Sequence, residues 1–370
     1  MLADYEPPAA GEWARVAPHQ AGFDAAALAA AVAFAEANET GWERDLAVQI
    51  GKGHFEPPPW NEIIGPTRPR GGPSGLVLRG GRIAAAWGDP ARVDMTFSAS
   101  KSYLSMCAGL AFDDGLLPDP QRPVRELVDD GGFDPPHNAA IQWHHLLQLT
   151  SEWEGELWDK PDLVDRNRDL ATEGLNLEKG KARPLQAPGT HWEYNDVRVN
   201  RLALALLRLW RRGLPDLVRA RIMDPVGASA TWEWHGYRNS FVDIDGRPVQ
   251  SVSGGGHWGG GLFISSYDHA RVGLMMLRGG RWGGRQLLSP EWLRRSLTPC
   301  ALKPTYGYMW WLNTDRGMYP SAAATGFAAL GAGSNVVWID PAADLVVVLR
   351  WIAKDKVDAM LGRVYAALRG

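Results

Sequence analysis

The sequence is poor in the residues that several protein classes require. Its 370 residues include only two cysteines, Cys107 and Cys300, which lie far apart and have no histidine at metal-ligand spacing. A disulfide framework and a zinc site both need more of these residues, closer together. We therefore expect neither, and we expect no metal or organic cofactor.

Clustered positive charge and long apolar runs are also missing. The 39 Lys and Arg against 42 Asp and Glu give a formal net charge of -3, and no basic run stands out, which argues against a nucleic-acid partner. No stretch of about 18 apolar residues occurs, and the first residues lack the basic and then apolar pattern of a signal segment. We expect a cytoplasmic protein without a membrane partner; its oligomeric state is left open.

The apolar residues that are present suffice for a large core and follow recognisable periods. Hydrophobic residues make up 45% of the chain. The Ala-rich stretch 20–37 predicts a helix, and residues 75–89 predict a β-hairpin around a Gly-Gly turn. A helix should begin near Ser98 and end at Gly115. Further helices are expected over 267–277 and 354–368, and two strands are expected between them, over NVVWID and DLVVVLRW.

This order of elements predicts an α+β fold, an α/β sandwich. Strands near both ends of the chain imply one sheet completed by distant segments, flanked by helices. We expect residues 1–107 and 251–370 to form this α/β domain. Residues 108–250 should form an inserted, mainly helical lobe, and a cleft between two lobes is a favoured place for a ligand.

One tetrapeptide, Ser98-Ala99-Ser100-Lys101, carries the arrangement of an activated serine. Residues i and i+3 share a helix face, so the Lys101 amine can reach the Ser98 hydroxyl. A helix N-terminus disfavours an ammonium and stabilises an oxyanion, and a serine needs a base to become a nucleophile. Ser100 is the rival nucleophile, but it lies about 100° around the helix. The alternative is that Ser98 has no catalytic role and only caps the N-terminus of the helix.

The surrounding motifs resemble one enzyme family. TFSASKSYLSMCAGLAFDDGLL, HHLLQLTSEWEG, PGTHWEYNDVRVNRLALALL, GGGLFISSYDHARVGLMML, YGYMWWL and ALGAGSNVVWIDPAADLVVV follow in the order found in class C β-lactamase-like serine hydrolases. That family includes penicillin-binding peptidases, carboxylesterases, D-aminopeptidases and 6-aminohexanoate-oligomer hydrolases. The resemblance covers roughly residues 75–368. It implies a β-lactamase/transpeptidase-like fold with an antiparallel sheet.

The resemblance also implies roles for individual residues. Ser98 would be the nucleophile, Lys101 its proton partner and Tyr194 a second acid/base group. A phenol beside an ammonium is a reasonable acceptor for the serine proton. The family's usual Tyr-x-Asn motif reads Tyr194-Asn195-Asp196 here. We expect an Asp at this position to pair with Lys101 and hold it protonated, which shifts base duty towards Tyr194.

The third family motif has two possible registers, Ala329-Leu330-Gly331 and Thr325-Gly326-Phe327. Neither carries the lysine that binds a substrate carboxylate in penicillin-recognising enzymes. In the first register the Ala332 N–H would pair with the Ser98 N–H as an oxyanion hole, and Gly331 would let the backbone approach the substrate.

Other motifs offer weaker candidates. The loop GGGHWGGG matches G-x-G-x-x-G without the strand-then-helix setting of a dinucleotide site, so we expect it to shape the cleft through His257 and Trp258. His191 precedes Tyr194 by three residues and is a candidate supporting residue. An acidic stretch beginning at Glu152 is either a solvated loop or an attraction site for a cationic substrate. No Gly-x-Ser-x-Gly elbow occurs.

The sequence therefore predicts a serine hydrolase that cleaves a small ester or amide through a Ser98 acyl-enzyme. A D-aminopeptidase or a β-lactamase-type amidohydrolase is the alternative within the same chemistry. A catalytically weak binding protein on the same fold is the alternative of another class, because fold does not guarantee activity.

Overall fold

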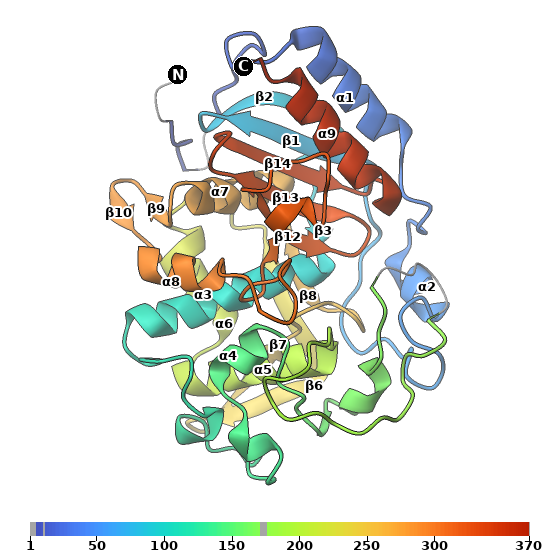
Figure 1. Cartoon of the computed structure of the whole chain (residues 1–370), viewed down its shortest axis with the longest axis vertical. Helices are drawn as coiled ribbons and strands as arrows, with labels where there is room; N and C mark the ends of the chain where they lie inside the picture. Colours follow the sequence, from blue (N-terminus) through green and yellow to red (C-terminus); the bar gives the residue numbers. More distant parts are fainter. Residues whose placement is uncertain (1–4, 10–11, 171–175, 370) are drawn as a thin grey trace.

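A six-stranded antiparallel sheet forms the centre of the molecule (Figure 1). The computed structural model describes residues 5–9, 12–170 and 176–369. The sheet has the strand order β11-β12-β13-β14-β1-β2, so β1 from the first quarter of the chain pairs with β14 from the last. As predicted, distant segments complete one sheet. Its strands are β1 (Ser74–Arg79), β2 (Arg82–Trp87), β11 (Trp311–Leu312), β12 (Phe327–Gly331), β13 (Asn335–Asp340) and β14 (Leu345–Arg350).

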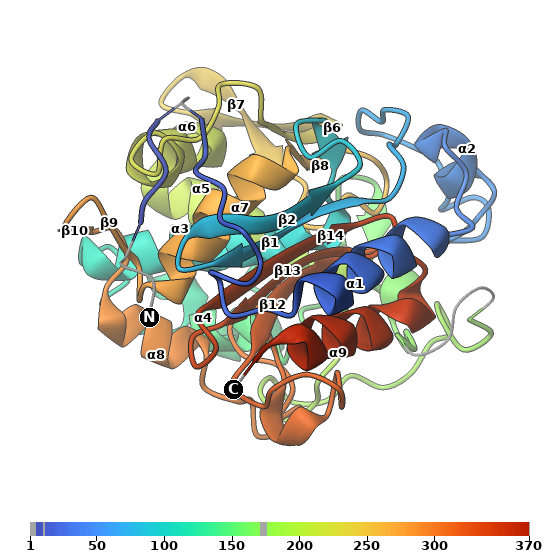
Figure 2. The same cartoon turned by 90° about the horizontal axis from the view of Figure 1, so that it is seen from above.

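Helices cover both faces of this sheet, so side chains along its strands are buried on both sides. Val77 and Val347 pack in one core with α1 (Ala25–Ala37) and α9 (Val357–Ala367). Their neighbours Leu76 and Val348 point to the opposite core, as the period of two in a strand requires. Figure 2 shows α1 and α9 together on one face, with α7 (Ser266–Leu277) across the sheet from them.

Helix α3 (Ser100–Asp113) is the central helix of the second core. All its residues from Ser100 to Ala111 are buried, which explains why its sequence lacks a polar face. It packs against α5 (Asp196–Trp210) on one side and the sheet on the other. Ser98 lies in a short 3-10 helix, Phe97–Ala99, directly before α3. The predicted helix start near Ser98 is confirmed.

Residues 108–250 contain more β-structure than the sequence analysis expected. The long strand β6 (Glu233–Ile244) and β7 (Arg247–Val252) form a hairpin, which the sequence analysis missed. With β3 (Asp94–Met95) and β8 (Gly261–Ile264) they build a second antiparallel sheet of order β3-β8-β6-β7. The division of the chain into two domains stays a prediction.

The remaining elements are short. Apart from 3-10 turns, they are α2 (Leu46–Gly51), α4 (Trp143–Leu147), β4 (Glu156–Leu157), β5 (Lys160–Pro161), α6 (Leu214–Val218), a π-helical turn (Arg219–Met223), β9 (Arg281–Trp282), β10 (Arg285–Gln286) and α8 (Pro290–Ser296). None of the helices in the described part of the chain is both long and apolar enough to span a bilayer.

Candidate active site

Ser98 is presented by a strained turn. The preceding Phe97 has φ 48°, a left-handed conformation that is unfavourable for a bulky side chain. Such strain persists only where the surroundings enforce it, and it concentrates at functional sites. Phe97, Ala99 and Ser100 are buried, whereas Ser98 is partly exposed. The turn therefore leaves Ser98 partly accessible among buried neighbours.

Lys101 joins Ser98 to Asp196. Its Nζ lies 2.8 Å from Ser98 Oγ and 2.5 Å from Asp196 Oδ1. The lysine side chain is only 2% exposed; its contact with Asp196 is buried, and its contact with Ser98 is partly buried. The i, i+3 geometry expected from the sequence is present, and so is the expected Lys101–Asp196 pair.

Ser100, the rival nucleophile, points into the protein. Its Oγ donates to the carbonyl oxygens of Phe97 at 2.6 Å and Gly254 at 2.8 Å. Its residue is completely buried. A hydroxyl held in this way neither reaches a substrate nor meets a base.

Tyr194 approaches Lys101 with its ring. The Lys101 ammonium lies 4.6 Å from the ring centroid, and the Arg168 guanidinium lies 5.1 Å from it. Trp311 stacks on the same ring at 5.8 Å. Among the described residues, no hydrogen bond ties down the Tyr194 hydroxyl. Ser98, Lys101 and Tyr194 are thus brought together, with a cation–π contact rather than a hydrogen bond as the link to the tyrosine.

Three side chains of the described residues bind the Asp196 carboxylate. Besides Lys101, Arg168 Nη1 lies 2.6 Å and His257 Nδ1 lies 3.1 Å from Asp196 Oδ2. Burial opposes ionisation of this carboxyl, but the charge of Lys101 and the hydrogen bond from His257 outweigh it and hold the pKa of Asp196 well below its usual range. Asp196 is therefore an ionised carboxylate whose two oxygens are shared among three side chains.

A second group of charges continues from His257. Its Nε2 makes a short contact with Glu56 Oε1, and Lys179 Nζ lies 2.5 Å from the same oxygen. Lys179 Nζ also lies 2.9 Å from Asp165 Oδ1. We call Lys101, Arg168, Lys179, Asp196, Asp165, Glu56 and His257 the Asp196 network.

Three members of this network have the residue types of a metal site. Ligand atoms of Glu56, Asp165 and His257 all lie within 4.8 Å of one another, and the three residues are buried. The Lys179 ammonium, however, already contacts both carboxylates. Burial opposes ionisation of Asp165, but the charges of Lys179 and then Arg168 outweigh it and lower the pKa of Asp165 to about 2. Asp165 is therefore ionised at neutral pH. An ammonium ion thus supplies the positive charge in this cluster.

Two glycines allow the close approach of backbone that the site needs. A Cβ on Gly255 would lie 1.9 Å from Asp196 Oδ1 and 2.6 Å from Lys101 Nζ. A Cβ on Gly331 would lie 1.9 Å from the Thr96 carbonyl oxygen and 3.1 Å from the Ala99 nitrogen. The end of β12 therefore packs on the Ser98 turn, which favours the register Ala329-Leu330-Gly331 and brings the position after it, Ala332, to this turn.

The alternative glycine, Gly326, lies elsewhere. A Cβ there would collide with the Trp338 ring, at 1.9 Å from Cζ2. The oxyanion role of the Ser98 and Ala332 N–H groups stays a prediction.

Other predicted site residues have structural positions. Asn195 caps α5, accepting from the Val197 and Arg198 N–H groups and donating to the Asp162 carbonyl. Trp258 is fully buried, and its indole N–H donates to the Trp60 carbonyl at 2.8 Å. It therefore packs beneath His257 and does not line an open pocket.

His191 contributes no polar contact to the site. Within residues 5–9, 12–170 and 176–369, it makes no hydrogen bond or ion pair with a member of the Asp196 network. No polar contact of His191 with the described residues supports the prediction that it assists Tyr194.

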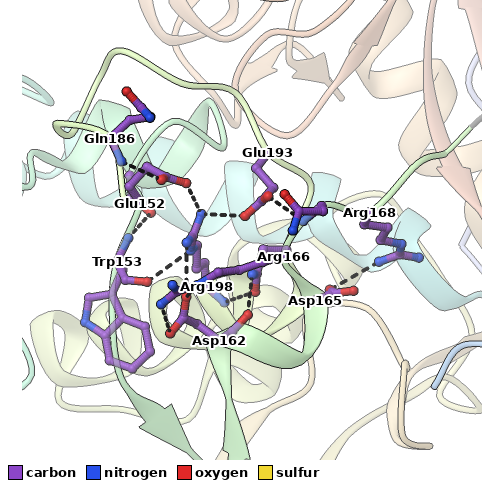
Figure 3. Close-up of polar contacts among 12 residues, drawn as sticks. Glu152, Trp153, Asp162, Asp165, Arg166, Arg168, Gln186, Glu193 and Arg198 are labelled. Carbon is purple, nitrogen blue, oxygen red and sulfur yellow. Dashed lines mark hydrogen bonds and ion pairs between the residues drawn. The ribbon is translucent and has the colours of Figure 1, made fainter. Parts of the chain in front are cut away.

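Glu152, the first residue of the acidic stretch, has a structural role. Glu152 is buried, and Figure 3 shows it beside Arg198, which also contacts Asp162 and Glu193. Arg183 Nη2 donates to Glu152 Oε1 at 2.7 Å. Burial opposes ionisation of Glu152, but Arg183 and then Arg198 lower its pKa to about 2. These ion pairs fasten the loops around 152–168 to the start of α5, and Glu152 is no attraction site for substrate.

Comparison with known proteins identifies the family of this chain. The sequence pattern of the beta-lactamase family matches residues 70–364. The chain belongs to the beta-lactamase family. The family and its structural neighbours are hydrolases of the serine β-lactamase fold, so the predicted family and fold are confirmed.

The relatives span several hydrolase types. A 6-aminohexanoate-dimer hydrolase of Paenarthrobacter ureafaciens is 24% identical over 297 residues, covering 74% of this chain and 70% of the relative. EstCE1, a hydrolase with promiscuous acyltransferase activity, superposes with a TM-score of 0.58 at 16% identity, covering 93% and 99% of the two chains. A penicillin-binding protein homologue from Caulobacter crescentus gives a TM-score of 0.57 at 14% identity, covering 87% and 96%. At these identities the solved structures show the fold alone.

The sequence analysis missed several residues of the site. Arg168, Glu56 and Lys179 come from loops without any periodic pattern, so no sequence signal indicated them. Gly255 lies in the glycine-rich loop 254–261, whose density of glycines was the only available sign of close backbone packing.

Proposed function

We propose that this member of the beta-lactamase family is a serine hydrolase that cleaves a small carboxylic ester, or an amide, through a Ser98 acyl-enzyme. The observation that carries the proposal is the position of Lys101 Nζ, 2.8 Å from the hydroxyl of a partly exposed serine and directly beneath the Tyr194 ring.

The reaction proceeds as acyl transfer in two steps. Ser98 Oγ attacks the substrate carbonyl and gives its proton to the Lys101 and Tyr194 pair. That pair passes the proton to the leaving alcohol or amine as the carbon–heteroatom bond breaks. Water then attacks the ester formed on Ser98 and gives a proton to the same pair, which returns it to Ser98 Oγ as the acyl carbon–Oγ bond breaks and the carboxylic acid is released. The Ser98 and Ala332 N–H groups would stabilise the oxyanion in both steps.

The charges around Ser98 favour a substrate without a carboxylate beside the reacting carbonyl. Lys101 and Arg168, the two cations at the Tyr194 ring, are both engaged with Asp196. The strand end at Gly331 carries no lysine. A neutral ester therefore fits better than a β-lactam or a peptide C-terminus, because its binding demands no free cation here.

The test uses Ser98→Ala with Ser100→Ala as the matched control. We expect Ser98→Ala to abolish p-nitrophenyl ester turnover and labelling by a serine-directed phosphonate, and we expect folded Ser100→Ala to be labelled at Ser98. Labelling of another serine in the Ser98→Ala protein would refute the assignment. A panel of short esters, D-amino acid amides and a chromogenic cephalosporin would then rank the substrate classes.

A further inference from the structure

His257 lies between two carboxylates that the proposed reaction does not use directly. Its Nδ1 faces Asp196 Oδ2 at 3.1 Å, and its Nε2 makes a short contact with Glu56 Oε1. A neutral imidazole has one N–H and one lone pair, so it can donate to only one of these oxygens. With a neutral imidazole and an ionised Glu56, one ring nitrogen would face a carboxylate oxygen with no proton between them. The two close contacts therefore require one extra proton, either on His257 or on Glu56.

The other groups around His257 do not supply this proton. The rings of Phe55 and Trp258 lie with centroids 4.6 Å from the imidazole. Lys179 Nζ is 3.4 Å from His257 Nε2, but it is closer to Glu56 and Asp165. Among the described residues, His54 is the remaining titratable neighbour. Burial and then the charge of His257 lower the pKa of His54 to about 4, so His54 is uncharged at neutral pH.

Counting charges in the Asp196 network shows what the extra proton does. Without it, the three cations Lys101, Arg168 and Lys179 balance the three carboxylates Asp196, Asp165 and Glu56. With it, the network carries one surplus positive charge while Lys101 is an ammonium. All seven groups are largely removed from water, where a surplus charge is costly. The network is neutral again when Lys101 gives up its proton.

We propose that His257, with Glu56, holds a proton that favours the uncharged amine of Lys101, so that His257 is a positioning residue for the base of the hydrolase. The inference rests on the proposed function. It answers the difficulty that an ionised Asp196 poses, since a carboxylate 2.5 Å from Lys101 by itself favours the ammonium, which cannot accept the Ser98 proton. His257 and Arg168 also bind the Asp196 carboxylate, and their positive charge reduces the electrostatic stabilisation that this carboxylate gives to a protonated Lys101.

The experiment measures kcat/KM for a p-nitrophenyl ester against pH in the unchanged protein and in variants. It compares the pH at which kcat/KM falls to half its plateau on the acidic side, the midpoint of the acidic limb. In His257→Gln the amide still donates to Asp196 but brings no charge, so a neutral network keeps Lys101 protonated. We expect the midpoint of the acidic limb to move to higher pH by about one unit. Glu56→Gln imitates a protonated Glu56, and its limb should stay near that of the unchanged protein whatever its rate.

Two further variants keep the test decisive. Lys179→Met removes a cation while leaving His257 in place, and the same charge count predicts a shift to higher pH; it serves if His257→Gln does not fold. The matched control is His235→Gln, because His235 Nε2 also binds a carboxylate, Glu233, at 2.6 Å but contacts no member of the network. Its limb should not move.

The outcomes separate the two proposals. If His257→Gln and Lys179→Met lower kcat/KM equally at every pH, without moving the limb, His257 is only structural and the inference is overturned. If Ser98→Ala keeps its ester activity, the proposed function itself fails. Loss of activity in Ser98→Ala together with an unmoved limb in the other variants rejects the inference alone.

Discussion

The absence of a side chain at Gly255 is a condition for the Lys101–Asp196 pair. A Cβ at this position would lie 1.9 Å from Asp196 Oδ1 and 2.6 Å from Lys101 Nζ. Ordinary contacts between heavy atoms begin near 3.5 Å. Gly255→Ala must therefore open the space between the loop and the carboxylate by about 1.5 Å. The Lys101 amino group cannot follow the carboxylate, because the same Cβ would also crowd Lys101 Nζ.

The effect on rate and stability follows from this displacement. A misplacement of about 1 Å among catalytic groups costs on the order of 10²-fold in rate. Adding a methyl group to a filled interior costs about 1–3 kcal/mol of folding stability. We expect Gly255→Ala to lose about 10²-fold in kcat/KM for a p-nitrophenyl ester, while retaining its fold and all ionisable groups of the site.

The assay combines steady-state kinetics with thermal unfolding and phosphonate titration of reactive serines. Titration corrects the rate for the fraction of folded protein. Gly41→Ala is the matched control, because a Cβ at Gly41 meets nothing within 4 Å and its φ lies outside the left-handed region. Wild-type kcat/KM in Gly255→Ala would refute the view that the geometry of the Lys101–Asp196 pair matters for catalysis.

Two further predictions concern the phenol and the buried carboxylates. Tyr194→Phe keeps the ring that contacts Lys101 but removes the hydroxyl, and we expect kcat to fall by about 10²–10⁴; a near-normal kcat would leave proton transfer to Lys101 alone. Glu152 has a pKa lowered from 4.5 to about 2, so its stabilisation is present above pH 4.5 and is lost as the pH falls towards 2. We expect it to contribute on the order of 2 kcal/mol, so denaturant unfolding of Glu152→Gln should lose less stability between pH 7 and pH 3 than the unchanged protein does. Equal losses in the two proteins would contradict the ion-pair role of Glu152.

The local pattern of the sequence was sufficient to predict the contacts that depend on one helix or one hairpin. Ser98 lies in the 3-10 turn directly before α3 and Lys101 lies in the first turn of α3, three residues later, so helical geometry alone brings their side chains together. The hairpin β1–β2 and the strands β13 and β14 were indicated by their apolar runs and glycine turns. The ordered motifs also indicated the family, because several motifs in a fixed order are specific where one tetrapeptide is not.

Only the tertiary structure decided which residues surround Lys101. Glu56 and His257 are 201 residues apart in the chain and meet because two loops fold over the start of α5. Loops have no periodicity, so the positions of Arg168 and Lys179 depend on packing and charge pairing between distant segments. The β6–β7 hairpin was missed because its strand alternates irregularly between buried and exposed residues. Local patterns determined that Ser98 and Lys101 lie side by side, while long-range packing determined which charged groups surround Lys101.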